Sequence, residues 1–163
     1  MTAQCPETLL LRGEKLKLCA EPLGQYLKTM ANPIRFHATT TALWRGYIGT
    51  WAIEQGRLYL KEFWGTQGDE DGYSEVGIEA LFPNYPDGVF AHWFTGELRC
   101  PQGELIQYTH GGYASMYEMD LFLAIHQGQL TSERLAVNGP PRPPYDPKNF
   151  ENYEIPDFLK AKK

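Results

Sequence analysis

The chain has 163 residues and a mass of 18.6 kDa, which is the size of one domain, and 42% of its residues are hydrophobic. This is enough apolar material for a buried core, so the composition excludes disorder over most of the length. The formal net charge of -5 argues against a general nucleic-acid binder, because binding to phosphate backbones requires a basic surface.

Most of the chain is predicted to form strands, because aromatic and β-branched residues are frequent and apolar residues alternate with polar ones. In residues 117–125, for example, one face carries Tyr117, Met119, Leu121, Leu123 and Ile125. The predicted strands cover residues 8–12, 15–19, 35–44, 47–54, 57–64, 88–94, 96–100, 104–109, 117–126 and 129–137. Two short helices are predicted over residues 22–30 and 74–82, each followed by a proline that ends it.

A short motif, x-Gln-Gly-x-Leu, recurs at residues 54–58, 101–105 and 126–130, and residues 12–16 form a looser relative. Glycine adopts positive φ at little cost, as tight hairpin turns require. The motif therefore predicts four hairpins of similar geometry. We expect a mainly β fold in which antiparallel hairpins form a sandwich or a half-open barrel, with one or two short helices.

The composition changes at Asn138, where a run of glycine and prolines begins that cannot supply the hydrogen-bond donors of a sheet. We expect residues 1–137 to form the antiparallel β domain and residues 138–163 to form a proline-rich extended tail that packs on it. The tail has apolar side chains for such packing: Tyr145, Phe150, Tyr153, Ile155, Phe158 and Leu159.

The cellular location is predicted from signals that the sequence lacks. The first residues do not show the basic start and apolar stretch of a secretion signal, and no apolar run approaches the roughly 20 residues that span a bilayer. Three scattered cysteines, Cys5, Cys19 and Cys100, do not form a disulfide framework. We therefore expect a soluble protein of the reducing cytoplasm without membrane contact.

Residues 108–118 join two predicted strands and are rich in residue types that carry chemistry. His110 is a candidate catalytic base and Glu118 a candidate catalytic carboxylate. Tyr108, Tyr113 and Tyr117 are candidate ligand-binding residues. The alternative is structural: the glycines at 111 and 112 build a wide turn, and the tyrosines close one end of the sheets.

A second candidate binding segment contains Trp44 and Arg45, since an arginine beside aromatic rings can hold a carboxylate or a phosphate. The alternative is a strand corner in which Gly46 makes the bend and Arg45 pairs with an acid. His92, which lies between aromatic residues, is weak evidence for a metal site.

No motif predicts a metal or a cofactor. The histidines at 37, 92, 110 and 126 lack the spacing of metal ligands, and the acidic residues 69–71 lack the alternating oxygen ligands of a calcium loop. The glycine-rich phosphate loops and the nucleophile elbow of hydrolases are also missing.

Several blocks resemble a family of uncharacterised bacterial single-domain β-rich proteins: residues 41–47, Thr50-Trp51, residues 57–60, residues 110–113, and Ser115 with Tyr117-Glu118. The resemblance covers about residues 43–126. It implies a bacterial source, and no function or catalytic residue follows from it.

Three classes of function fit the sequence. The first is a small binding or interaction protein, for instance a partner or neutraliser of another protein, because acidic charge and aromatic residues suit an interface. The second is a small enzyme or ligand-binding protein in which Arg45, His110 and Glu118 handle an anionic substrate. The third is an oligomerisation domain that exchanges its tail. We prefer the first class, with a monomer or homodimer as the expected state, because no catalytic arrangement is recognisable.

Overall fold

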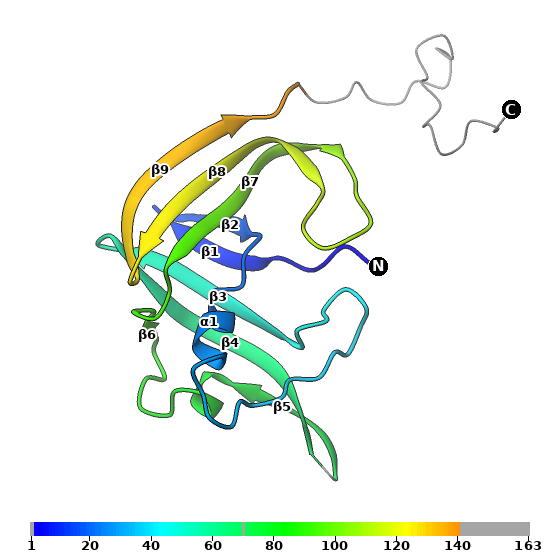
Figure 1. Ribbon diagram of the computed structural model, residues 1–163, viewed down its shortest axis with the longest axis vertical. Helices are drawn as coiled ribbons and strands as arrows, with labels where there is room; N and C mark the ends of the chain where they lie inside the picture. Colours follow the sequence, from blue (N-terminus) through cyan, green and yellow to red (C-terminus); the bar gives the residue numbers. More distant parts are fainter. Residues whose placement is uncertain (1, 70, 141–163) are drawn as a thin grey trace, which may run out of the picture.

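The computed structural model describes residues 2–69 and 71–140 and confirms the mainly β class, with 53% of residues in strands and 6% in helices (Figure 1). Its strands are β1 (Glu7–Leu11), β2 (Glu14–Leu18), β3 (Tyr47–Glu54), β4 (Arg57–Asp69), β5 (Gly72–Gly77), β6 (Val89–Phe90), β7 (Gly96–Gln107), β8 (Met116–His126) and β9 (Gln129–Val137). A five-residue helix, α1 (Leu23–Leu27), and the 3-10 turn η1 (Ile78–Ala80) complete the elements.

The strands form one sheet with the order β2-β1-β3-β4-β9-β8-β7, and β5 and β6 pair with β4. Neighbours are antiparallel except β1 and β3, which are parallel with Leu9 opposite Trp51. This parallel pair arises because the chain passes through α1 and a long irregular segment between β2 and β3, and so returns in the direction of β1.

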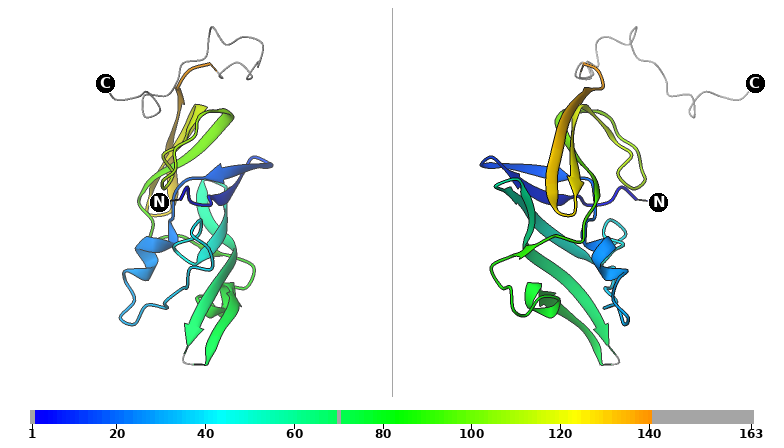
Figure 2. Two further views of the ribbon diagram at one scale, coloured as in Figure 1. Left: turned by 90° about the vertical axis from the view of Figure 1, so that its right-hand side faces the viewer. Right: turned by 60° about the vertical axis from the view of Figure 1, so that its left-hand side comes forward.

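The sheet is strongly bent, so that β7, β8 and β9 arch over β1 to β4 (Figures 1 and 2). Hydrogen bonds join the two parts, and those of the backbone include three that lie at two places. The N–H of Leu58 donates to Gly128 and that of Leu130 to Gly56, both over 2.8 Å, and the N–H of Cys19 donates to Arg99 over 2.8 Å. The core lies between the two parts and includes Leu9, Leu18, Trp51, Leu58, Leu60, Leu98 and Leu123.

Three of the four predicted glycine turns are hairpin turns. In each, two consecutive residues have positive φ, as at Gln55 (52°) and Gly56 (73°), which is the conformation of a type I′ turn. The prediction is wrong for residues 101–105. There the chain continues straight through β7, and Gly103, with φ of 80°, lies at a register shift against the Glu118 side chain. The predicted strands 96–100 and 104–109 are therefore parts of one strand.

Other local predictions also differ from the structure. Residues 35–44 form no strand, and only Phe36 makes an isolated bridge, to Gln67 of β4. The predicted helix over residues 74–82 is instead the second half of a hairpin followed by η1, because residues 72–77 pair along an extended β4. Of the predicted strand 88–94, only Val89–Phe90 is extended in the sheet.

The chain leaves the sheet at Asn138, which is fixed to β8. Its N–H donates to the carbonyl of Glu118 over 2.7 Å, and its side-chain amide donates to the carbonyl of Tyr117 over 2.9 Å. Most of the predicted tail, residues 141–163, lies outside the described residues. Within residues 2–69 and 71–140, no helix is long and apolar enough to cross a membrane.

Candidate functional site

Three segments that are far apart in the sequence meet at one end of the domain, beside the N-terminus (Figure 1). Residues 3–5 run between residues 36–46 and 108–115. The N–H of Gln4 donates to Gly112 over 2.9 Å, and that of Cys5 donates to Ala42 over 2.8 Å. The side chain of Gln4 also accepts the N–H of Trp44 and donates to the carbonyl of Thr41, each over 2.9 Å. We call these three segments the loop end.

Large aromatic side chains extend into solvent from the loop end. The Trp44 side chain is 67% exposed and that of Tyr108 is 59% exposed. The backbone N–H of Trp44 donates a hydrogen bond to the side chain of Gln4. This bond holds the backbone from which the Trp44 side chain extends. The loop end therefore presents aromatic surface on a backbone that is already ordered.

Beneath this surface lies a buried cluster of charges around Arg45, whose side chain is only 7% exposed. One guanidinium nitrogen lies 3.6 Å from Oε2 of Glu7, and the other lies 3.6 Å from Oε1 of Glu21. The guanidinium also lies over the ring of Tyr47, with 5.6 Å between Cζ and the ring centroid. None of its three nitrogens makes a hydrogen bond with the described residues. Arg45 is thus held by charge and by the ring.

Glu7 lies on β1 and faces the core, where its side chain is inaccessible to solvent. It accepts a hydrogen bond from the N–H of Gly49 and a long one, 3.5 Å, from Nε1 of Trp51. Burial raises the pKa of Glu7 from an ordinary value of 4.5 to about 7, although Arg45 and these hydrogen bonds act in the opposite direction. Glu7 is therefore a carboxyl group that titrates near neutral pH.

Tyr113 connects the 108–115 loop to this charge cluster. Its hydroxyl donates to Oε1 of Glu21 over 3.0 Å and lies 3.4 Å from the carbonyl of Cys5. Burial raises the pKa of Tyr113 far above its ordinary value, with Arg45 acting to lower it. The phenol is therefore a hydrogen-bond donor at neutral pH, and it ties the loop to the segment before α1.

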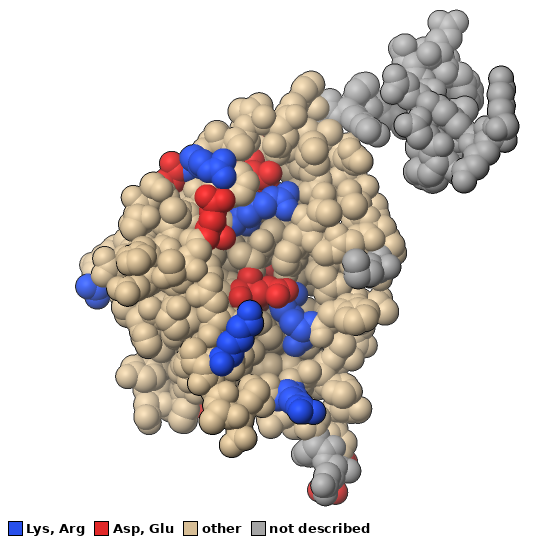
Figure 3. Space-filling model, in the orientation of Figure 1, with Lys and Arg blue, Asp and Glu red and all other residues tan. Residues whose placement is uncertain are grey.

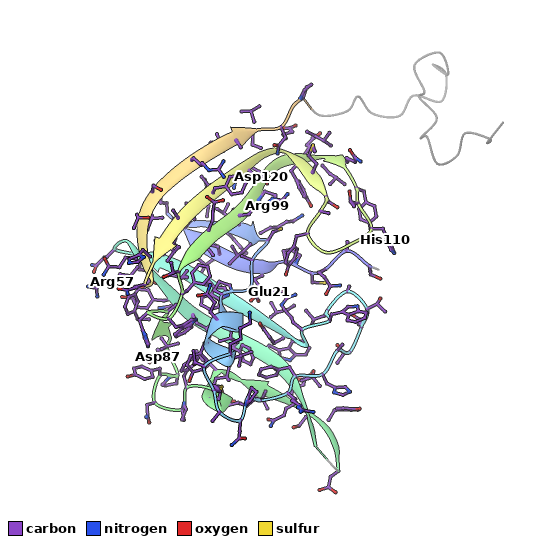
Figure 4. All side chains as sticks on the ribbon, viewed as in Figure 1. Glu21, Arg57, Asp87, Arg99, His110 and Asp120 are labelled. Atoms are coloured by element: carbon purple, nitrogen blue, oxygen red, sulfur yellow. The ribbon has the colours of Figure 1, made fainter. Side chains whose placement is uncertain are left out.

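The other side of the same loop is fixed by Arg99 of β7, which Figure 4 shows close to Asp120. Its guanidinium donates to Oδ1 of Asp120 over 2.9 Å, to the carbonyl of Tyr113 over 2.5 Å and to that of Ser115 over 2.9 Å. A carboxylate on one side and two loop carbonyls on the other satisfy most of the donors of Arg99. The conformation of residues 113–115 is therefore set by the sheet.

The structure brings together five of the seven predicted site residues at the loop end: Trp44, Arg45, Tyr108, His110 and Tyr113. Tyr117 and Glu118 lie apart on β8, where Lys17 is 3.4 Å from the Tyr117 hydroxyl. His110 is exposed at the edge of the molecule (Figure 4), with Nδ1 at 3.1 Å from the Tyr108 hydroxyl. The predicted base and the predicted carboxylate are thus on different elements and are not bonded to each other.

Sequence reasoning missed three residues of this region: Glu7, Glu21 and Arg99. Only Glu7 carries a local signal, because it has the same parity as Leu9 and Leu11 on a strand and so falls on the apolar face. Glu21 contacts Arg45 and Tyr113, which are far from it in the sequence. Arg99 contacts β8 and the loop before it. No residue spacing in the sequence predicts these contacts.

The candidate residues line neither of the two grooves described below, and they form no metal centre among the described residues. The described part of the chain contains no group of three or more His, Cys, Asp or Glu residues that could hold a metal ion. Two grooves of about 470 Å³ each lie elsewhere, one lined by residues such as Lys15, Lys61 and Asp87, the other by residues such as His92 and His126. On the face shown in Figure 3, acidic and basic side chains are interspersed.

Comparisons with protein-family models, with curated proteins and with solved structures give no match for this chain. The resemblance to a bacterial family over residues 43–126 therefore stays a prediction, and the function is argued from the geometry.

Proposed function

We propose that this protein is a binding module that recognises another protein through the loop end. The observation that carries the proposal is the exposed Trp44, 67% accessible, on segments that are cross-linked by hydrogen bonds. Tryptophan and tyrosine dominate the binding energy of protein interfaces, and an ordered backbone lowers the entropy that binding costs. A cytoplasmic location in a bacterium, and a monomeric or homodimeric state, are parts of the same proposal.

The charges at the loop end support binding better than catalysis. Arg45 lies beneath the surface between the carboxyl groups of Glu7 and Glu21, so acidic groups of the protein itself already face its guanidinium. An anionic substrate would have to displace Glu7 or Glu21 to reach it. The alternative function, an enzyme that uses Arg45, His110 and Glu118 on an anion, has less support because these residues line neither groove.

The test compares wild-type protein with Trp44→Ala and Tyr108→Ala variants. Partners are captured from cells of the source organism, purified, and titrated against each variant by calorimetry. We expect Trp44→Ala to weaken binding by roughly 30-fold, as for an interface hot spot of about 2 kcal/mol. Tyr85→Ala is the matched control, because Tyr85 is 55% exposed in a turn between η1 and β6.

Equal affinities of the wild type, both loop-end variants and the control would contradict the proposal. A thermal-shift screen with small anions tests the alternative on the same proteins. A ligand whose stabilising effect disappears in His110→Ala, while Trp44→Ala retains it, would favour the enzyme or ligand-binding function instead.

A further inference from the structure

The loop end differs from the chain as a whole in its charge. Residues 3–5, 36–46 and 108–115 contain no Asp, Glu or Lys, although 21% of the residues of the chain are charged. The one charged residue of these segments is Arg45, whose side chain is only 7% exposed. The exposed residues of the three segments are all uncharged or histidine: His37, Ala38, Thr39, Thr40, Thr41, Trp44, Tyr108, His110, Gly112 and Ala114. The loop end therefore presents aromatic rings, hydroxyls and imidazoles without a guanidinium, ammonium or carboxylate of its own.

The only cation of the three segments faces inward. The Arg45 guanidinium lies 3.6 Å from the carboxyl group of Glu7 and 3.6 Å from that of Glu21. Glu21 comes from the segment before α1, and its side chain is 38% exposed. Its Oε1 also accepts a hydrogen bond of 3.0 Å from the Tyr113 hydroxyl. The acidic group that borders the loop end is thus already engaged by a cation and a phenol of the protein itself.

Charged side chains reach solvent on other parts of the molecule. Exposed or half-exposed ion pairs outside the loop end include Arg12–Glu133, Lys61–Glu54 and Arg134–Glu97. The turns after β1 and β3, which carry Arg12 and Glu54, lie on the side opposite to the 108–115 loop (Figure 1). Figure 3 shows charged side chains over the middle of this face and none along the margin that the 108–115 loop forms. The uncharged surface is therefore a property of the loop end and not of the whole protein.

Such a surface restricts the chemistry of a partner. Charge complementarity steers association where opposite charges face each other, and salt screens charges that are more than about 8–10 Å apart. A charged partner surface would lose its hydration at the loop end without meeting an opposite charge. Apolar side chains and peptide groups, in contrast, can pack on exposed aromatic rings and form hydrogen bonds with uncharged polar groups.

We propose that the loop end recognises an uncharged segment of its partner protein, which presents apolar side chains and peptide groups to Trp44 and Tyr108. This inference rests on the proposed function and adds to it the chemistry of the partner. The net charge of -5 belongs to surfaces outside the loop end, where it favours solubility.

A random peptide library displayed on phage tests the inference. Phage are selected on the full-length protein and counter-selected on Trp44→Ala, so that peptides which need Trp44 remain. We expect these peptides to contain fewer Asp, Glu, Lys and Arg residues than the starting library. At constant pH, the affinity of synthetic copies should change by less than about twofold between roughly 0.1 and 0.5 M salt, because no facing charges are screened.

Two substitutions of opposite charge at Thr41 sharpen this test. Thr41 is exposed and close to Trp44 in the chain, and its carbonyl keeps the bond from Gln4 when the side chain is replaced. Thr41→Lys and Thr41→Glu should both weaken binding of the selected peptides by at least about tenfold, because each brings a charge to a surface that offers it no partner. Ser132→Lys and Ser132→Glu, on β9, are the matched controls and should leave the affinity unchanged. Melting temperatures verify that all four variants fold.

Three results would overturn the inference. Selected peptides enriched in one sign of charge, with opposite effects of Thr41→Lys and Thr41→Glu, would show a charged partner and leave the proposed function intact. A selection without any peptide that needs Trp44 would also remove the inference, while titration of the captured partners still decides the proposed function. Retention on dextran, a neutral polysaccharide, that Trp44→Ala loses would assign the surface to carbohydrate and contradict both.

Discussion

The loop end and the end of β9 both expose large hydrophobic side chains, yet these side chains are held in different ways. At the loop end, Trp44 lies above the buried groups of Arg45 and Glu7, and hydrogen bonds hold its backbone. At the end of β9, Leu135 and Val137 continue the face of a sheet whose other end is the core. The difference teaches that exposure alone does not identify a binding surface. Exposed aromatic side chains on a backbone that polar contacts fix suit a partner, whereas the end of β9 has no such polar contacts around Leu135 and Val137.

The largest expected effect tests whether the frame of the loop end depends on its charges. Arg45→Ala leaves Glu7 buried without its cation, and removing one partner of a buried pair costs about 3–5 kcal/mol. We expect a loss of this size in the free energy of unfolding, measured by urea denaturation at about pH 8. Lys61→Ala is the control, because its pair with Glu54 is exposed and contributes roughly 0–1 kcal/mol.

A loss below about 1 kcal/mol for Arg45→Ala would show that the charge cluster does not hold the loop end together. Trp44 would then be held no differently from Val137 at the end of β9, and the contrast between the two regions would disappear.

The second prediction concerns pH and Glu7. Its pKa is about 7 in the folded protein against an ordinary 4.5, so between these values the folded state holds a proton that the unfolded state has released. Raising the pH through this window therefore lowers the free energy of unfolding, by up to about 1.4 kcal/mol per pH unit. In Glu7→Gln this contribution is absent. Urea denaturation at several pH values should give a flatter profile for Glu7→Gln than for the wild type.

Glu54→Gln provides the matched control, because it removes an exposed carboxylate and leaves Glu7 in place. Its profile should keep the contribution from Glu7. Parallel profiles of the wild type and Glu7→Gln would mean that Glu7 is ionised at the same pH in the folded and unfolded states. No pH dependence specific to the loop end would then remain.

The strands were predicted correctly where apolar and polar residues alternate along the chain or where a tight turn joins two strands. Alternation predicted residues 117–126 and 129–137, and Gln-Gly pairs predicted the turns at residues 55–56 and 127–128. The same motif failed at Gly103, because whether a glycine reverses the chain or sits in a bulge depends on the neighbouring strand, here on Glu118. Residues 35–44 failed for a similar reason, since apolar residues in a loop can pack on a sheet without joining it.

The candidate site was predicted in part, because residue type indicates what a side chain can do but not which side chains meet. Trp44, Arg45 and Tyr113 were chosen for their chemistry, and the fold brings Arg45 and Tyr113 to the same carboxylate. That carboxylate, Glu21, lies in an irregular segment before α1, where no periodicity marks it. Glu118 was chosen because it lies near His110 in the sequence, yet an extended strand carries it away from the loop.

The smallest expected effect concerns the end of β9. Val137 is 75% exposed, so Val137→Ser removes little buried apolar surface, and we expect the free energy of unfolding to fall by less than about 0.5 kcal/mol. Leu123→Ala on β8 is the contrasting variant, because Leu123 is inaccessible to solvent and its truncation should cost about 2–5 kcal/mol. Both losses are measured by urea denaturation. A loss for Val137→Ser that approaches that for Leu123→Ala would mean that Val137 is covered in solution, whereas a small loss leaves it exposed as Trp44 is.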